Sequence, residues 1–121
     1  MTAPVASAPT IDARADALWR RAQRFIRSAL QTDTVAGAVT LTDAYGTVLG
    51  DATGGAFAVT LPPAAELPGW TFRVKKVDAS ANAVTVTASG TDRIDGAATF
   101  PLAVQYQSVT VQSDGSAWWV L

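Results

Sequence analysis

Residues 70–87, WTFRVKKVDASANAVTVT, contain two runs in which apolar and polar side chains alternate. In the first run (70–75) an aromatic residue or a valine alternates with threonine, arginine and lysine, and the second run (84–87) alternates valine with threonine. Successive side chains of a β-strand point to opposite faces, so this period of two predicts strands with one apolar face. The intervening DASAN (78–82) is typical of a turn. The stretch therefore predicts two strands of a β-sheet.

The same alternation recurs through the second half of the chain. Candidate strands lie at 39–41, 57–61, 104–112 and 117–121, and turn signals such as YGTVLGD (45–51) separate them. No segment of helical length remains after residue 31, so we exclude parallel βαβ units and expect antiparallel pairing. The pattern predicts a mainly β protein, a compact antiparallel β-sandwich, barrel or β-prism. The candidate core residues are Phe57, Val59, Leu61, Phe72, Val74, Val84 and Val86.

An amphipathic helix is predicted over residues 11–31, ahead of the strands. Apolar residues recur there at steps of four and three, and at 100° per residue they share one arc of the helix while the five arginines share the opposite arc. Thr10 is placed to cap the helix N-terminus. The apolar positions are Ile11, Ala15, Leu18, Trp19, Ala22, Phe25, Ile26, Ala29 and Leu30.

These patterns divide the chain into two parts. We expect an N-terminal part over residues 1–37, consisting of an extended arm (1–9), the helix and a linker (32–37), followed by a β-domain over 38–121. Five arginines against two aspartates give residues 11–31 a charge of +3, and four cations against eight acids give residues 32–121 a charge of −4. The chain therefore joins a basic segment to an acidic domain.

Composition excludes several classes of chemistry. The 121 residues include no cysteine and no histidine, which removes disulfides, thiolate catalysis, the usual zinc sites and the commonest general acid or base. The first ten residues lack the charged and apolar regions of a signal peptide, and no apolar run reaches the length of about 18 that a membrane span needs. We expect synthesis in the cytoplasm without secretion or membrane insertion.

Two adjacent tryptophans, Trp118 and Trp119, lie among the last four residues of the chain, followed by Val120 and Leu121. The preceding SDGS (113–116) is typical of a hairpin turn, so the final residues are predicted to form a paired strand. Adjacent strand residues point to opposite faces, so one indole would fill the core and the other would need a second partner. We therefore predict a subunit interface at Trp118 and Trp119, and the sequence does not tell which of the two faces it.

Residues 35–121 resemble the small β-domain of head-fibre, spike and tail-fibre proteins of tailed bacteriophages and gene transfer particles. The resemblance is carried by DATGGAFAVTLPPA (51–64), PGWTFRVKKVDASANAVTVTASGTDRIDG (68–96) and VTVQSDGSAWWVL (109–121). It implies a non-enzymatic virion structural protein, located on the virion as a head fibre, spike, capsid decoration or tail-fibre component. In that family the β-domain is usually a homotrimer.

The helix lies outside this resemblance, and we predict that it anchors the chain to capsid or tail proteins. The predicted anchoring residues are Trp19, Arg20, Arg21, Arg24, Phe25, Ile26 and Arg27. The apolar residues that share one arc of this helix form a stripe. This apolar stripe could instead join three copies or pack on the chain's own sheet. A basic amphipathic helix can also lie on a membrane or hold phosphates, but its alanines give little bulk for a membrane, and we expect neither membrane nor nucleic acid as a partner.

Three ligand or enzyme alternatives arise from the β-domain. DASAN with Asp92 and Asp95 suggests calcium, but the spacing lacks the glycine and terminal glutamate of a calcium loop, so ordinary turns explain it better. The same two aspartates are the one close carboxylate pair available for glycosidase chemistry, in a domain with little room for a cleft. We therefore expect no enzyme activity, cofactor or metal. The main rival function is a carbohydrate-binding module recognising host glycans through Trp70, Tyr106, Trp118 and Trp119.

Overall fold

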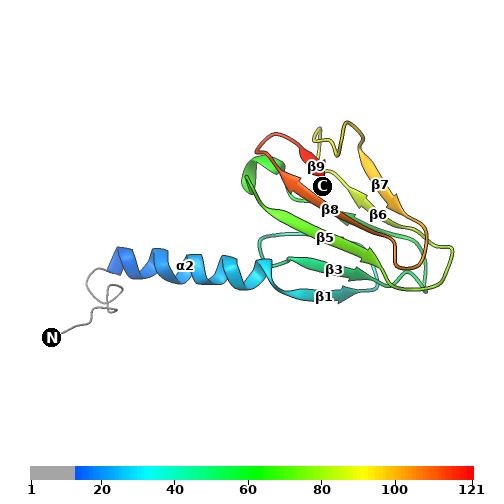
Figure 1. Ribbon diagram of the computed structural model, residues 1–121, viewed down its shortest axis with the longest axis horizontal. Helices are drawn as coiled ribbons and strands as arrows, with labels where there is room; N and C mark the ends of the chain where they lie inside the picture. The colour runs from blue at the N-terminus through cyan, green and yellow to red at the C-terminus, as the bar shows by residue number, and fades with distance from the viewer. Residues whose placement is uncertain (1–12) are drawn as a thin grey trace.

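The computed structural model describes residues 13–121, except for the side chains of residues 13–16, 24, 25, 27 and 28. The predicted arm (1–9) and cap Thr10 therefore lie outside the described residues. One helix, α2 (Ala13–Ala29), precedes a domain made of strands. It projects away from that domain along its long axis (Figure 1). The predicted helix is confirmed over these 17 residues.

Within residues 13–121, nine strands form two sheets. A five-stranded sheet has the order β1 (Thr32–Val35), β3 (Thr47–Gly50), β5 (Thr71–Lys76), β8 (Ser108–Ser113) and β9 (Trp118–Val120). A four-stranded sheet has the order β2 (Val39–Thr40), β4 (Phe57–Thr60), β6 (Val84–Thr87) and β7 (Thr99–Leu102). A short 3₁₀ turn, η2 (Ala64–Glu66), lies between β4 and β5. The mainly β class is confirmed, but neither sheet closes into a barrel.

The prediction of purely antiparallel pairing is wrong, because both sheets are mixed. From β1 to β6 the chain alternates between the sheets, so that β1, β3 and β5 are parallel in one sheet and β2, β4 and β6 are parallel in the other. Strands β7, β8 and β9 then add antiparallel pairs. Crossing to the opposite sheet and back makes each parallel connection, so no intervening helix is needed. The lack of a helix after residue 31 therefore excludes βαβ units but does not exclude parallel strand pairing.

Three strands were missed or misassigned in the sequence. Residues 32–35, expected to be a linker, form β1 and pair with β3. Residues 47–50, within the stretch interpreted as a turn, form β3 itself. Strand β7 contains Pro101 and lies at the edge of its sheet, the place where a strand tolerates the missing N–H of proline. Residues 104–107, expected in a strand, form the turn before β8.

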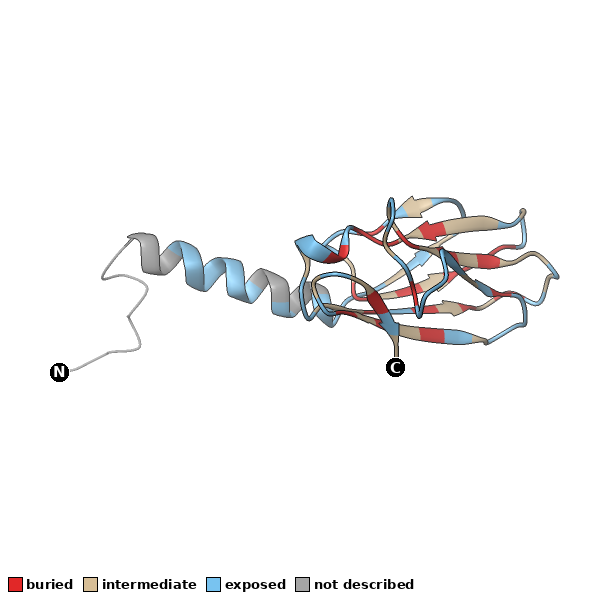
Figure 2. Ribbon diagram, turned by 90° about the horizontal axis from the view of Figure 1, so that it is seen from above, coloured by how far each residue is buried: buried red, intermediate tan, exposed pale blue. Residues whose placement is uncertain are grey.

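The core lies between the two sheets (Figure 2). Gly50 shows how closely they approach, because a Cβ built on it would lie 3.0 Å from both Val84 methyl groups and 3.3 Å from the Phe57 ring of the opposite sheet. Six of the seven predicted core residues are fully buried, and Phe57 is partly buried against them. The largest buried side chains include Leu41, Leu61, Phe72, Ile94, Leu102 and Trp118.

Strand direction gives the β-domain two distinct ends. Strands β1, β3 and β5 all begin near the helix, so the loops that contain residues 41–46, 61–70, 88–98 and 114–117 gather at a helix-proximal end. The loops that contain 51–56, 77–83 and 103–107 gather at the helix-distal end (Figure 1).

Candidate interaction surfaces

Helix α2 exposes its apolar stripe. The exposed fractions of Leu18, Trp19, Ile26 and Leu30 lie between 54% and 80%. Residues 17–23 are all exposed, and Figure 2 shows the helix extending beyond the sheets without covering either of them. The alternative that the stripe packs on the chain's own sheet is therefore wrong. The stripe is available to another molecule.

The predicted anchoring residues are only partly described. Trp19, Arg20 and Ile26 are exposed on α2, and Arg21 is exposed and also reaches a cavity of the β-domain. Helix α2 contains Arg24, Phe25 and Arg27, but their side chains lie outside the described residues. The helix thus presents large apolar side chains and arginine side chains within a single turn.

Trp118 lies in the core of a single chain. Its exposed fraction is 0%, its ring centroid is 5.6 Å from that of Phe72, and its Nε1–H donates to the Pro62 carbonyl at 3.2 Å. Both the apolar ring and the polar N–H are thereby satisfied within the chain. The prediction that Trp118 belongs to a subunit interface is wrong, because no part of it reaches the surface.

Trp119 is the indole that points outward. It is 48% exposed, and its Nε1–H donates to the Asp114 carboxylate at 2.9 Å. This hydrogen bond, with those from the backbone N–H groups of Ser116 and Ala117, holds the pKa of Asp114 below its usual range. The predicted split between one buried and one outward indole is confirmed. Trp119 is held in place on the surface and remains a candidate for an interface.

The final strand is held on both sides. Strand β9 pairs with β8, and on its other side Trp118 exchanges backbone hydrogen bonds with Arg93 and Asp95. The Asp95 carboxylate also accepts from the backbone N–H of Val120 at 3.0 Å. The exposed Trp119 therefore lies on a well-anchored strand, and the exposed Leu121 follows it, with its backbone N–H donating to the Thr110 carbonyl at 2.9 Å.

The aromatic platform expected for glycan binding is not assembled. Trp118 is buried, and Trp70 is partly buried with its ring centroid 6.1 Å from that of Phe72. Tyr106 and Trp119 are exposed, but they lie at opposite ends of β8, about 20 Å apart at 3.3 Å per residue. Tyr106 instead lies beneath the Lys75 ammonium, 5.6 Å from the ring centroid.

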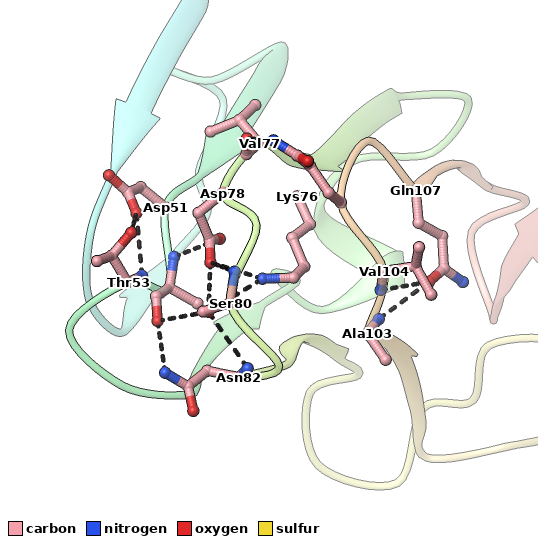
Figure 3. A network of polar contacts seen from close by, with 12 residues as sticks. Asp51, Thr53, Lys76, Val77, Asp78, Ser80, Asn82, Ala103, Val104 and Gln107 are labelled. Atoms are coloured by element: carbon pink, nitrogen blue, oxygen red, sulfur yellow. Dashed lines mark hydrogen bonds and ion pairs between the residues drawn. The ribbon is translucent and has the colours of Figure 1, made fainter.

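A buried polar network occupies the helix-distal end (Figure 3). The ammonium of Lys76, fully buried at the end of β5, lies 2.7 Å from the carboxylate of Asp78. Asp78 also accepts hydrogen bonds from the backbone N–H groups of Ala52 and Ser80, at 2.7 and 3.0 Å, and from the Ser80 hydroxyl. The side-chain amide of Asn82 donates to the Ala52 carbonyl at 2.9 Å. The network joins the two distal loops 51–56 and 77–83.

The charge state of Asp78 follows from these contacts. Burial of the carboxyl disfavours its charged form, but the hydrogen bonds from Lys76, Ser80 and Ala52 outweigh it and hold the pKa of Asp78 well below its usual range. The pKa of Asp51 in the same region is lowered by hydrogen bonds from the side chain and backbone of Thr53. The DASAN segment (78–82) thus connects the distal loop 77–83 to the distal loop 51–56 through hydrogen bonds of Asp78 and Asn82.

The two aspartates considered for catalysis are also engaged with the backbone. Asp92 accepts from the N–H of Ala64 at 2.8 Å, and Asp95 accepts from Val120. Each carboxylate thus joins a helix-proximal loop to another element. Within residues 13–121 no three histidine, cysteine, aspartate or glutamate side chains gather as a metal site would require, and no helix is long and apolar enough to cross a membrane.

An open cavity of about 380 Å³ lies at the helix-proximal end. Leu41, Leu61 and Leu67 contribute apolar side chains, while Asp43 and Glu66 contribute carboxylates. Arg21 reaches it from α2. Sequence reasoning missed this site, because its leucines follow strands and count as core while its acids stand in separate turns. Only the fold brings these segments together.

Comparison of the sequence with protein-family models and with curated proteins gives no match.

Proposed function

We propose that this protein is a non-enzymatic structural component of a virion, in which α2 attaches the chain to a larger shell and the β-domain trimerises. The observation that carries the proposal is the exposed apolar stripe on a helix beside a β-domain whose core is already complete. Leaving Leu18, Trp19 and Ile26 in water costs about 1.5–3 kcal/mol each relative to burial. A partner that covers them accounts for their presence.

Charge supports the same proposal. The helix region carries +3 and the rest of the chain −4, so the helix favours an acidic partner surface. Arginine and tryptophan, both present in Trp19–Arg21, are the residue types that contribute most at protein interfaces. The resemblance of residues 35–121 to head-fibre, spike and tail-fibre β-domains supplies the virion as the assembly and a homotrimer as the oligomer.

Co-sedimentation with particles tests this proposal. Purified particles from the source culture are banded on a density gradient with tagged full-length chain, and the chain is measured across the gradient. We expect the wild type to band with the particles and Leu18→Ser/Ile26→Ser to remain at the top. The matched control is Val104→Ser, which removes a similarly exposed apolar side chain from a helix-distal loop. Wild-type chain absent from the particle band would contradict the proposal.

A carbohydrate-binding module is the second candidate function. It is favoured by the half-exposed indole of Trp119, which Asp114 holds in one orientation on the surface. A single ring without a second aromatic nearby offers one stacking position. A glycan array in which binding disappears in Trp119→Ala would support this candidate over the virion proposal, and no binding by the wild type would remove it.

A further inference from the structure

The helix-proximal cavity combines an apolar floor with an acidic rim. Leu41 and Leu61 are fully buried beneath it, and Leu67 is partly exposed at its wall. Asp43 and Glu66 are both exposed at its edge. Its volume of about 380 Å³ is enough for one large aromatic side chain and part of a neighbouring residue. A complementary ligand would therefore present a bulky apolar group beside a positive charge.

Helix α2 carries that combination at Trp19 and Arg20. Trp19 is the largest described exposed apolar side chain of the helix, and Arg20 is exposed beside it. A chain's own α2 cannot present them to its own cavity in this arrangement, because it presents Arg21 there and leaves Trp19 exposed. The same residues on a second copy have no such restriction.

We propose that the cavity binds α2 of a second copy of this chain, with Trp19 of one copy entering it against the partly exposed Leu67 and Arg20 facing Asp43 and Glu66. This inference rests on the homotrimer of the proposed function and assigns a contact within it. Each copy gives its helix to one neighbour and receives a helix from the other. Such a head-to-tail contact closes into a ring under threefold symmetry.

Cysteine cross-linking tests the contact, and the absence of native cysteine makes every disulfide assignable. Full-length chains carrying either Ala22→Cys, at an exposed position one turn from Trp19 on α2, or Leu67→Cys, with tags of different size, are co-expressed and oxidised. We expect a covalent product containing one chain of each kind on a non-reducing gel. The control replaces Leu67→Cys by Thr53→Cys, an exposed residue of a helix-distal loop, and should give no such product.

The outcomes separate cleanly. A mixed product with Leu67→Cys and none with Thr53→Cys supports the proposal. No mixed product, equal products at both positions, or only Ala22→Cys pairs joined helix to helix would overturn it. Because particle co-sedimentation is measured separately, a chain that bands with particles but gives no mixed product refutes this contact while the proposed function stands.

A charge exchange provides a second test that does not depend on cross-linking. Arg20→Glu and Glu66→Arg should each raise the trimer dissociation constant about tenfold or more, because each places like charges across the contact. The double variant should return it close to the wild-type value in sedimentation velocity. Single variants that assemble like the wild type, or a double variant as weak as the singles, would contradict the contact.

Discussion

Trp118 and Trp119 are adjacent in the sequence, but their side chains lie on opposite faces of β9 and have different roles. Both are tryptophans on the same strand, yet one is fully buried against Phe72 and the other is half exposed beside Asp114. The alternation of strand side chains predicts this split, but the sequence does not tell which indole faces inward. That depends on the register of β9 with β8, where Trp118 lies opposite the buried Ser113.

Alanine substitutions at the two tryptophans should differ strongly in effect. Trp118→Ala should lower the free energy of unfolding by about 3–5 kcal/mol, because it leaves a large cavity in the core and an unpaired Pro62 carbonyl. Trp119→Ala should lower it by less than about 1 kcal/mol, because its ring is already half in water. Urea unfolding followed by circular dichroism measures both. Comparable losses would contradict the assignment of core and surface.

The pairing of Lys76 with Asp78 predicts a pH dependence. A carboxyl whose pKa is lowered by folding stabilises the fold above its unfolded pKa of about 4, and this stabilisation is lost as the pH falls through the folded value. Asp78→Asn should therefore lower the urea midpoint at pH 7, and the difference from wild type should narrow from about pH 5 downward. A constant difference for Asp78→Asn would refute the charged pair.

At the scale of elements, the sequence predicted strands where apolar and polar residues alternate without interruption. Strand β5 and the pair β4 and β6 follow from it, and so does the helix, whose 3.6-residue period is uninterrupted. Strands β1 and β3 are as long as β4 and β6, but β1 (TDTV) contains a single apolar residue and β3 (TVLG) has two adjacent ones, so neither shows the alternation. Their partners are far along the chain, so only the assembled sheet shows that they are strands.

Parallel pairing was unpredictable for a related reason. The sequence shows which faces are apolar, but both parallel and antiparallel neighbours satisfy that pattern. The alternation of the chain between two sheets depends on connections such as 51–56, which cross from β3 to β4. The cavity has the same origin, since its acids lie in loops that only this path brings to one end.

The contact between the sheets makes a prediction at Gly50. Gly50→Ala should destabilise the protein by about 1–3 kcal/mol, because the added methyl group would meet Val84 at 3.0 Å. In a Val84→Ala background the same change should cost less, since the obstructing methyl groups are gone. Gly54→Ala is the control, because nothing lies within 4 Å of its added Cβ. Thermal melts of the four variants measure the coupling, and additive effects would contradict this close packing.

At the scale of the whole molecule, the β-domain buries its large core side chains, whereas the helix leaves its apolar stripe exposed to solvent. The domain encloses its core, joins its distal loops through Asp78 and holds its last strand on both sides. The helix leaves Leu18, Trp19 and Ile26 exposed. The sequence predicted the stripe but left open what covers it, because periodicity reports the apolar face and not its partner. The structure removes the chain's own sheet from those alternatives.

The central claim is that the exposed apolar residues serve contacts between copies and with a shell. Sedimentation equilibrium of the full-length chain over a wide concentration range tests its first part most directly. We predict a mass three times the 12.5 kDa of one chain, falling toward 12.5 kDa in Trp19→Ser/Ile26→Ser. A wild-type chain that stays at the mass of one copy at every concentration would contradict the account.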